Sequence, residues 1–165
     1  PKDEFKDNAN WPYMIYICEA RRMLGEYVMT EANCSHKRGV DDIIAYGAFG
    51  MGSHVVQYFV NEKGFVRRDG VIWRTPPGLY GISYRSVVSK REECKNLYVP
   101  VCLSASHVAH GSIRMEPVFM TMGQSVAMAA GLAIDEKVDV QDVDYDLFRK
   151  FIPTPNNFKP VKIKS

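Results

Sequence analysis

Short hydrophobic runs separated by turn residues fill the first half of the chain, from residue 13 to residue 92. The runs at 13–18, 43–49 and 55–60 are rich in β-branched and aromatic residues, a composition typical of β-strands. Asp-Gly and Pro-Pro-Gly turns separate the later runs and indicate hairpins. The pattern therefore predicts a β-rich portion over 13–92, built as antiparallel hairpins or a meander.

The pattern changes after a polar loop, and residues 96–152 predict one strand followed by two helices. The run 97–103 is short and continuously apolar, as in a buried parallel strand. A predicted loop at 104–112 leads into a long helix, and a last short helix is capped by Asp142 or Asp144. Folds of the α/β type place ligands where such a strand ends and such a helix begins.

The strongest helical signal is the stretch 116–134, which carries no charged side chain after Glu116. Glu116 and Pro117 suit a first helical turn, because a carboxylate favours the positive end of the helix dipole and proline has no N–H to satisfy. Polar and glycine residues inside the stretch argue against a membrane span. We predict a buried central helix packed on a sheet, with a flat face of small residues at helical spacing, namely Gly123, Ala127, Ala130 and Gly131.

Length and composition indicate one ordinary globular unit. The chain has 165 residues, 46% hydrophobic and 24% charged, and no linker separates its two portions. We therefore predict a mixed α+β fold in a single domain or a fragment of one. The net charge of +2 gives no footprint for nucleic acid, and the sequence leaves the compartment open. Because the chain opens on proline, we expect it to be processed or cut from something longer.

A few residues carry candidate chemistry. His107, in the loop before the long helix, could donate to an electron-rich group, although a histidine satisfied by the backbone accounts for it equally well. His54 follows a glycine-rich bend at 47–52, whose spacing indicates a close backbone approach and not a phosphate loop. Arg85 and Arg114 border apolar structure, and an internal salt bridge is at least as good an explanation for Arg85. No spacing typical of a metal site is present, so no metal is predicted.

Three stretches resemble a known family. The run 82–133, which includes LYVPVCLSASHVAHGSIRMEPVFM, is similar to the C-terminal part of FAD-dependent oxidoreductases often labelled xanthan lyase-like. EARRMLGEYVMTEANC at 19–34 and IIAYGAFGMGSHVVQYFV at 43–60 also resemble that family. Cys18 and Gly52 depart from the family pattern, which has arginine and often aspartate at these places.

The resemblance implies a flavin site at the start of the long helix. In the family, the strand matching 97–103 and the helix matching 116–134 complete the FAD-binding domain, with the helix amino end beside the flavin pyrimidine ring. The candidate cofactor-binding residues are Ser112, Ile113, Arg114, Met115, Pro117, Gly123 and Gln124. The candidate catalytic residues are His54, His107 and Arg114, and the candidate substrate-binding residues are Tyr46, Tyr84 and Arg85.

One element of the family is absent from this sequence, namely the strand-G-x-G-x-x-G-helix motif that holds the FAD pyrophosphate. The resemblance therefore implies an amino-terminal FAD-binding half as partner, in cis or in trans. A small-molecule substrate is expected, and only the family label suggests a carbohydrate. We expect the chain by itself to be inactive and to self-associate through uncovered apolar faces of its long helix.

Two other functions stay open on the sequence alone. A non-catalytic β-rich binding or interaction module would fold as a stable, flavin-free domain. A hydrolase using Ser53 or Ser106 with a histidine has little support, because the sequence contains no G-x-S-x-G motif.

Overall fold

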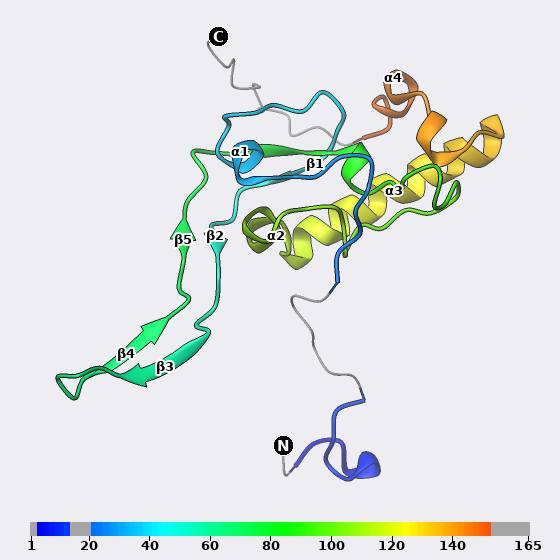
Figure 1. Ribbon diagram of the computed structural model, residues 1–165. Coiled ribbons are helices and arrows are strands. Elements are labelled where there is room, and N and C mark those ends of the chain that lie inside the picture. The colour runs from blue at the N-terminus through cyan, green and yellow to red at the C-terminus, as the bar shows by residue number, and fades with distance from the viewer. Residues whose placement is uncertain (1–2, 14–20, 153–165) are drawn as a thin grey trace.

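One long helix and three antiparallel strand pairs organise the part of the chain that the computed structural model describes, residues 3–13 and 21–152 (Figure 1). The mixed α+β class predicted from the sequence is confirmed. The body of the molecule contains the long helix and one strand pair, and the other two pairs extend away from it (Figure 1). Residues 14–18 of the predicted first strand lie outside the described residues.

The three strand pairs are separate two-stranded sheets that follow one another along a ribbon, and the chain reverses at its tip. Strand β1 (Ile43–Gly47) pairs with β6 (Tyr80–Ser83), β2 (Met51–Gly52) pairs with β5 (Trp73–Arg74), and β3 (Gln57–Val60) pairs with β4 (Val66–Asp69), all antiparallel. Since each pair is nested inside the previous one in sequence, the chain runs out along β1 to β3 and returns along β4 to β6. The predicted antiparallel hairpin and the strands predicted within 43–49 and 55–60 are confirmed.

The core lies between the β1–β6 pair and helix α3 (Glu116–Glu136). The Ser125 hydroxyl donates to the Ile44 carbonyl at 2.7 Å and joins the helix to β1. Fully buried side chains come from both portions predicted from the sequence, for example Ile82 from the strands and Met122 from the helix. The two portions therefore share one hydrophobic core.

Short helical segments connect these elements. They are η1 (Lys6–Asn8), α1 (Glu31–Cys34), η2 (Tyr84–Ser86), α2 (His107–Ile113), η3 (Val140–Asp142) and α4 (Tyr145–Phe148). At the start of α4 the Asp144 carboxylate accepts hydrogen bonds from the amides of Asp146 at 2.9 Å and Leu147 at 3.2 Å. Asp144 is therefore the N-terminal cap of α4, one of the two cap residues predicted from the sequence.

Helix α3 begins at Glu116 as predicted, but it is buried along one face only, which corrects the prediction of a buried helix. Its buried residues are Met122, Ser125, Val126, Ala129 and Ala133. Met120 and Ile134 are each 74% exposed. The described residues supply a single layer for α3 to pack on, and the opposite side of the helix has no cover within them.

The small residues of α3 lie largely on that uncovered side. A Cβ atom added at Gly123 or Gly131 would meet no heavy atom within 4 Å. Helix α3 is also long and apolar enough to cross a membrane by length and composition, a test that core helices of soluble proteins pass as well. Its apolar side is used here to pack on β1.

The strand predicted at 97–103 does not form. Pro100 has no N–H to give to a strand ladder, and the chain bends from residue 100 to residue 102. The segment makes separate hydrogen bonds instead, such as that from the Val99 amide to the Val87 carbonyl at 2.8 Å. The parallel strand that the sequence suggested is therefore replaced by extended, irregular chain.

The loop predicted at 104–112 is wrong in part, because helix α2 occupies most of it. Ser106 explains the difference. Its hydroxyl accepts a hydrogen bond from the Ala109 amide at 3.3 Å and caps the first turn. Two helices, α2 and then α3, therefore meet near Arg114 where the sequence predicted one.

Candidate functional site

A cavity of about 400 Å³ lies where α3 begins. The bend between β1 and β2, strand β5 and the α2–α3 junction form its walls. It brings together three residues predicted from the sequence, His54, Arg114 and Met115. Its volume falls within the range of small-molecule sites, about 300–1,000 Å³.

The junction between α2 and α3 places Arg114 and Met115 at this cavity. The Arg114 amide donates to the His110 carbonyl at 3.0 Å and closes α2. Met115 is extended, with φ −80° and ψ 136°, so the chain turns there before α3 starts at Glu116. The two side chains are thus held between two helix ends, and not on a free loop.

Close backbone packing fixes the wall opposite the helices. A Cβ atom added at Gly111 would lie 2.7 Å from the Gly52 carbonyl oxygen, so α2 touches β2 directly. The ring of Trp73 lies against the same strand, since a Cβ atom at Gly50 or Gly52 would come within 2.3 or 2.7 Å of it. The close approach predicted for the glycine-rich bend is therefore confirmed, and Trp73 is the group that approaches.

A buried hydrogen-bond chain ties α2 to the bend. The fully buried Ser112 hydroxyl donates to the Phe49 carbonyl and contacts the Tyr80 hydroxyl at 2.5 Å. Burial raises the pKa of Tyr80 far above its ordinary value, so this phenol stays protonated and can donate to Ser112. The Ser112 side chain therefore supports the cavity wall.

Two aromatic rings and one arginine are the main features of the cavity lining. Arg114 is only 6% exposed, and the amino end of the 21-residue helix α3 adds its positive dipole end. Phe49 and Trp73 pack edge to face, with ring centroids 5.4 Å apart and an interplanar angle of 82°. Glu116 supplies one carboxylate at the rim. Such a site suits a flat group with an electron-rich edge.

Comparison with known proteins shows a family to which the chain is similar. Residues 1–152 match the family model described as FAD dependent oxidoreductase. The chain belongs to the FAD-dependent oxidoreductase family. No curated protein and no solved structure matches it. The resemblance seen in the sequence is therefore confirmed at the level of the family, and the family implies FAD as cofactor.

Part of FAD fits the residues present in this member of the FAD-dependent oxidoreductase family. The isoalloxazine ring is flat and its pyrimidine edge becomes negative on reduction, which matches the aromatic wall, Arg114 and the α3 amino end. The pyrophosphate has no matching glycine-rich strand-loop-helix in the sequence. The named strands also pair antiparallel throughout the described residues, unlike a nucleotide-binding parallel sheet.

The predicted catalytic residues are not all in one place. His54 lines the cavity with Arg114, whereas His107 lies at the start of α2 beside a separate space of about 20 Å³. That space has room for about one water molecule. Gly52 and Ser53 line both spaces and separate the two histidines. His54 and Arg114 are therefore the pair that the fold brings together.

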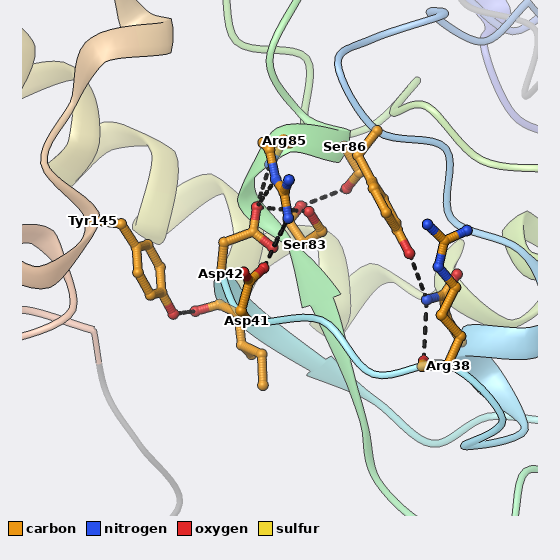
Figure 2. A network of polar contacts seen from close by, with 10 residues as sticks. Arg38, Asp41, Asp42, Ser83, Arg85, Ser86 and Tyr145 are labelled. Carbon is orange, nitrogen blue, oxygen red and sulfur yellow. Dashed lines mark hydrogen bonds and ion pairs between the residues drawn. The ribbon is translucent and has the colours of Figure 1, made fainter. Parts of the chain in front are cut away.

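Arg85, predicted to bind substrate, forms an internal ion pair, one of the two explanations left open by the sequence. Its Nε donates to Asp42 at 2.9 Å and its terminal nitrogen to Asp41 at 2.8 Å (Figure 2). The hydrogen bond to Asp42 raises the pKa of Arg85 above its ordinary value. Asp42 also accepts from the Ser83 hydroxyl at 2.7 Å, so this cluster fixes β6 against the loop before β1.

Tyr84 and Arg85 line a second cavity of about 590 Å³, which lies beside α4. The Tyr84 hydroxyl donates to the Val140 carbonyl at 2.6 Å and contacts the Tyr98 hydroxyl at 2.6 Å. Burial raises the pKa of Tyr84 strongly. Tyr46 is not among the residues that line this cavity, so the three predicted substrate-binding residues do not form one site. Their role in binding substrate stays a prediction.

The remaining cofactor candidates are spread along the two helices. Ile113 is fully buried in the core, and Pro117 lies in the first turn of α3. Gly123 and Gln124 lie further along α3, outside the cavity lining. No group of three or more metal-ligating side chains gathers within residues 3–13 and 21–152.

The sequence missed the aromatic wall of the cavity. Phe49 belongs to the predicted strand 43–49 and Trp73 to the predicted hairpin region, and neither was assigned a role at the site. The glycines at 50 and 52 were the available signal, because closely spaced glycines beside an aromatic hairpin indicate a ring that packs on backbone.

Proposed function

We propose that this chain is the C-terminal, flavin-facing portion of a flavin-dependent oxidoreductase. The supporting observation is the cavity at the start of α3, where buried Arg114, the helix amino end and Trp73 converge. Membership of the FAD-dependent oxidoreductase family supplies the cofactor class. The xanthan lyase-like label adds no chemistry that these residues support.

A bound flavin supplies the two-electron acceptor of the reaction. The residues of this chain would hold the flavin ring and favour its negatively charged state. Arg114 and the α3 dipole would stabilise negative charge at the ring edge, because both present positive charge at this cavity. Phe49 and Trp73 would form the apolar wall beside the ring. His54 lines the same cavity and would lie beside the bound ring.

The FAD pyrophosphate requires a second component, an amino-terminal FAD-binding half in cis or in trans. The uncovered side of α3 supports this proposal, because it is apolar and carries Gly123 and Gly131 with open space around them. A neighbouring backbone could approach closely there. By itself, the 165-residue chain should show no oxidoreductase turnover, and FAD should be lost when the chain is desalted.

Replacing Arg114 by methionine should raise the dissociation constant for lumiflavin, a flavin ring without phosphates, by about 10- to 100-fold. The methionine keeps much of the side-chain volume and removes the positive charge. An equilibrium titration followed by flavin fluorescence measures this change on the whole chain. Circular dichroism establishes that the variant is folded.

Glu116→Gln is the matched control, since it changes a charge at the rim of the same cavity with the opposite sign. It should leave lumiflavin binding unchanged or strengthen it. Equal binding by Arg114→Met and the unmodified chain would contradict the proposed flavin site.

The alternative function is a non-catalytic β-rich binding or interaction module. The exposed hairpin formed by β3 and β4 favours it. The lumiflavin titration distinguishes the two functions. A binding module without cofactor chemistry would bind no flavin ring at the start of α3.

A further inference from the structure

The outer end of the ribbon, residues 56–70, projects from the body as a two-stranded arm (Figure 1). All eight residues of β3 and β4 are exposed. An isolated two-stranded hairpin is marginally stable in water at best. Packing against another surface would therefore stabilise the arm.

The two faces of the arm differ in character. The register pairs Tyr58 with Arg68 and Val60 with Val66, and these four side chains share one face. Val56 extends that face toward the body. We call these five residues the apolar face. It carries no acidic side chain, and its exposed fractions are 77% for Val56, 69% for Tyr58, 66% for Val60 and 68% for Val66.

The opposite face is more polar. Gln57 pairs with Asp69, and Phe59 pairs with Arg67. Phe59 is 46% exposed, less than any of the apolar side chains on the other face. The opposite face therefore carries two charged side chains, Asp69 and Arg67, compared with one on the apolar face.

The apolar face has the size of an interaction site. Four apolar side chains, each between 66% and 77% exposed, present on the order of a few hundred Å² of apolar surface, the size of patches that often serve as interaction sites. Two such faces pressed together bury on the order of 1,000 Å², close to the lower limit for a specific dimer.

We propose that the arm is a dimerisation element, and that its apolar face stacks on the apolar face of a second copy of this chain. A two-fold axis along the arm, between the stacked faces, exchanges the two strands. The register then places Tyr58 over Arg68 of the partner subunit, and Val60 over Val66 of the partner subunit. The two valine positions therefore meet valines, and each Arg68 meets the face of an aromatic ring.

This arrangement distinguishes a second copy from other occupants. Arg68 is the only charged residue on the apolar face, so an unrelated partner would have to supply a group that accepts a buried guanidinium. The second copy supplies Tyr58 at the matching position without any further component. The proposal concerns the arm alone and does not depend on the proposed flavin site.

Sedimentation of the whole 165-residue chain and of four variants tests the proposal. The unmodified chain should be a dimer at micromolar concentration. Val60→Glu and Val66→Lys should each raise the dimer dissociation constant by about 30-fold or more, because each places a charge against a valine. The double variant should restore dimers, since the two-fold axis puts the opposite charges face to face. Phe59→Glu, on the opposite face, is the control and should still dimerise.

A monomeric unmodified chain would overturn the proposal, and so would a dimer that Val60→Glu leaves intact. If Phe59→Glu lost dimers to the same extent as Val60→Glu, dimerisation would not depend on the apolar face, and this result would also contradict the proposal. Failure of the double variant to recover would overturn the two-fold stacking. Circular dichroism should show that each variant is folded, because residues 59, 60 and 66 are all exposed in a single copy of the chain.

Discussion

Replacing Gly111 by alanine should destabilise the protein by about 1–3 kcal/mol, the usual cost of overpacking a tight contact. The added Cβ atom would lie 2.7 Å from the Gly52 carbonyl oxygen, so α2 must move away from β2. Backbone groups on both sides make this contact, and neither can rotate aside as a flexible side chain would. Chemical denaturation followed by circular dichroism measures the change in the free energy of unfolding.

Gly123 provides the matched control, because it also lies in a helix but has open space around its Cβ position. Gly123→Ala should stabilise the protein by about 0.5–1 kcal/mol, since alanine loses less backbone entropy on folding. If both variants are stabilised, or both are destabilised to the same extent, the contact between α2 and β2 is not as close as the structure shows.

Replacing Asp42 by alanine should cost about 2–3 kcal/mol of folding free energy. Its carboxylate accepts hydrogen bonds from the Ser83 hydroxyl at 2.7 Å, the Arg85 amide at 3.0 Å and the Arg85 Nε at 2.9 Å. The Ser83 hydroxyl is fully buried and would lose its acceptor. The midpoint of denaturant unfolding reports the loss.

Asp41 tests whether burial, and not charge alone, decides this effect. It pairs with the same Arg85, but its side chain is 87% exposed, compared with 10% for Asp42. An exposed ion pair contributes about 0–1 kcal/mol, so Asp41→Ala should be close to neutral. Equal losses in the two variants would mean that the contacts of Asp42 with buried groups contribute little.

Local signals in the sequence predicted the parts of the site that depend on helix ends. Glu116 and Pro117 mark the start of α3, and this is where the helix begins. Arg114 and Met115 precede that start and could therefore be named as candidates. Because capping and proline chemistry act over a few residues, they can be read without knowing the fold.

The rest of the site depends on how distant segments pack. Trp73 reaches the cavity because the ribbon folds back and places β5 beside β2, a pairing that no local pattern specifies. Arg85 had two explanations in the sequence, and only the position of Asp42 decides for an ion pair. The strand predicted at 97–103 was wrong because of a local effect. Pro100 lacks an N–H group and interrupts an otherwise strand-like run.

The central claim is that the cavity at the start of α3 holds a flavin ring, and one titration tests it directly. The sequence has two tryptophans, so Trp11→Phe leaves Trp73, which lines the cavity, as the only one. Adding lumiflavin to this variant should quench Trp73 fluorescence in a saturable way, because the ring binds against the aromatic wall. Quenching that rises without saturation, or that is identical when Arg114→Met is added to the variant, would contradict the claim.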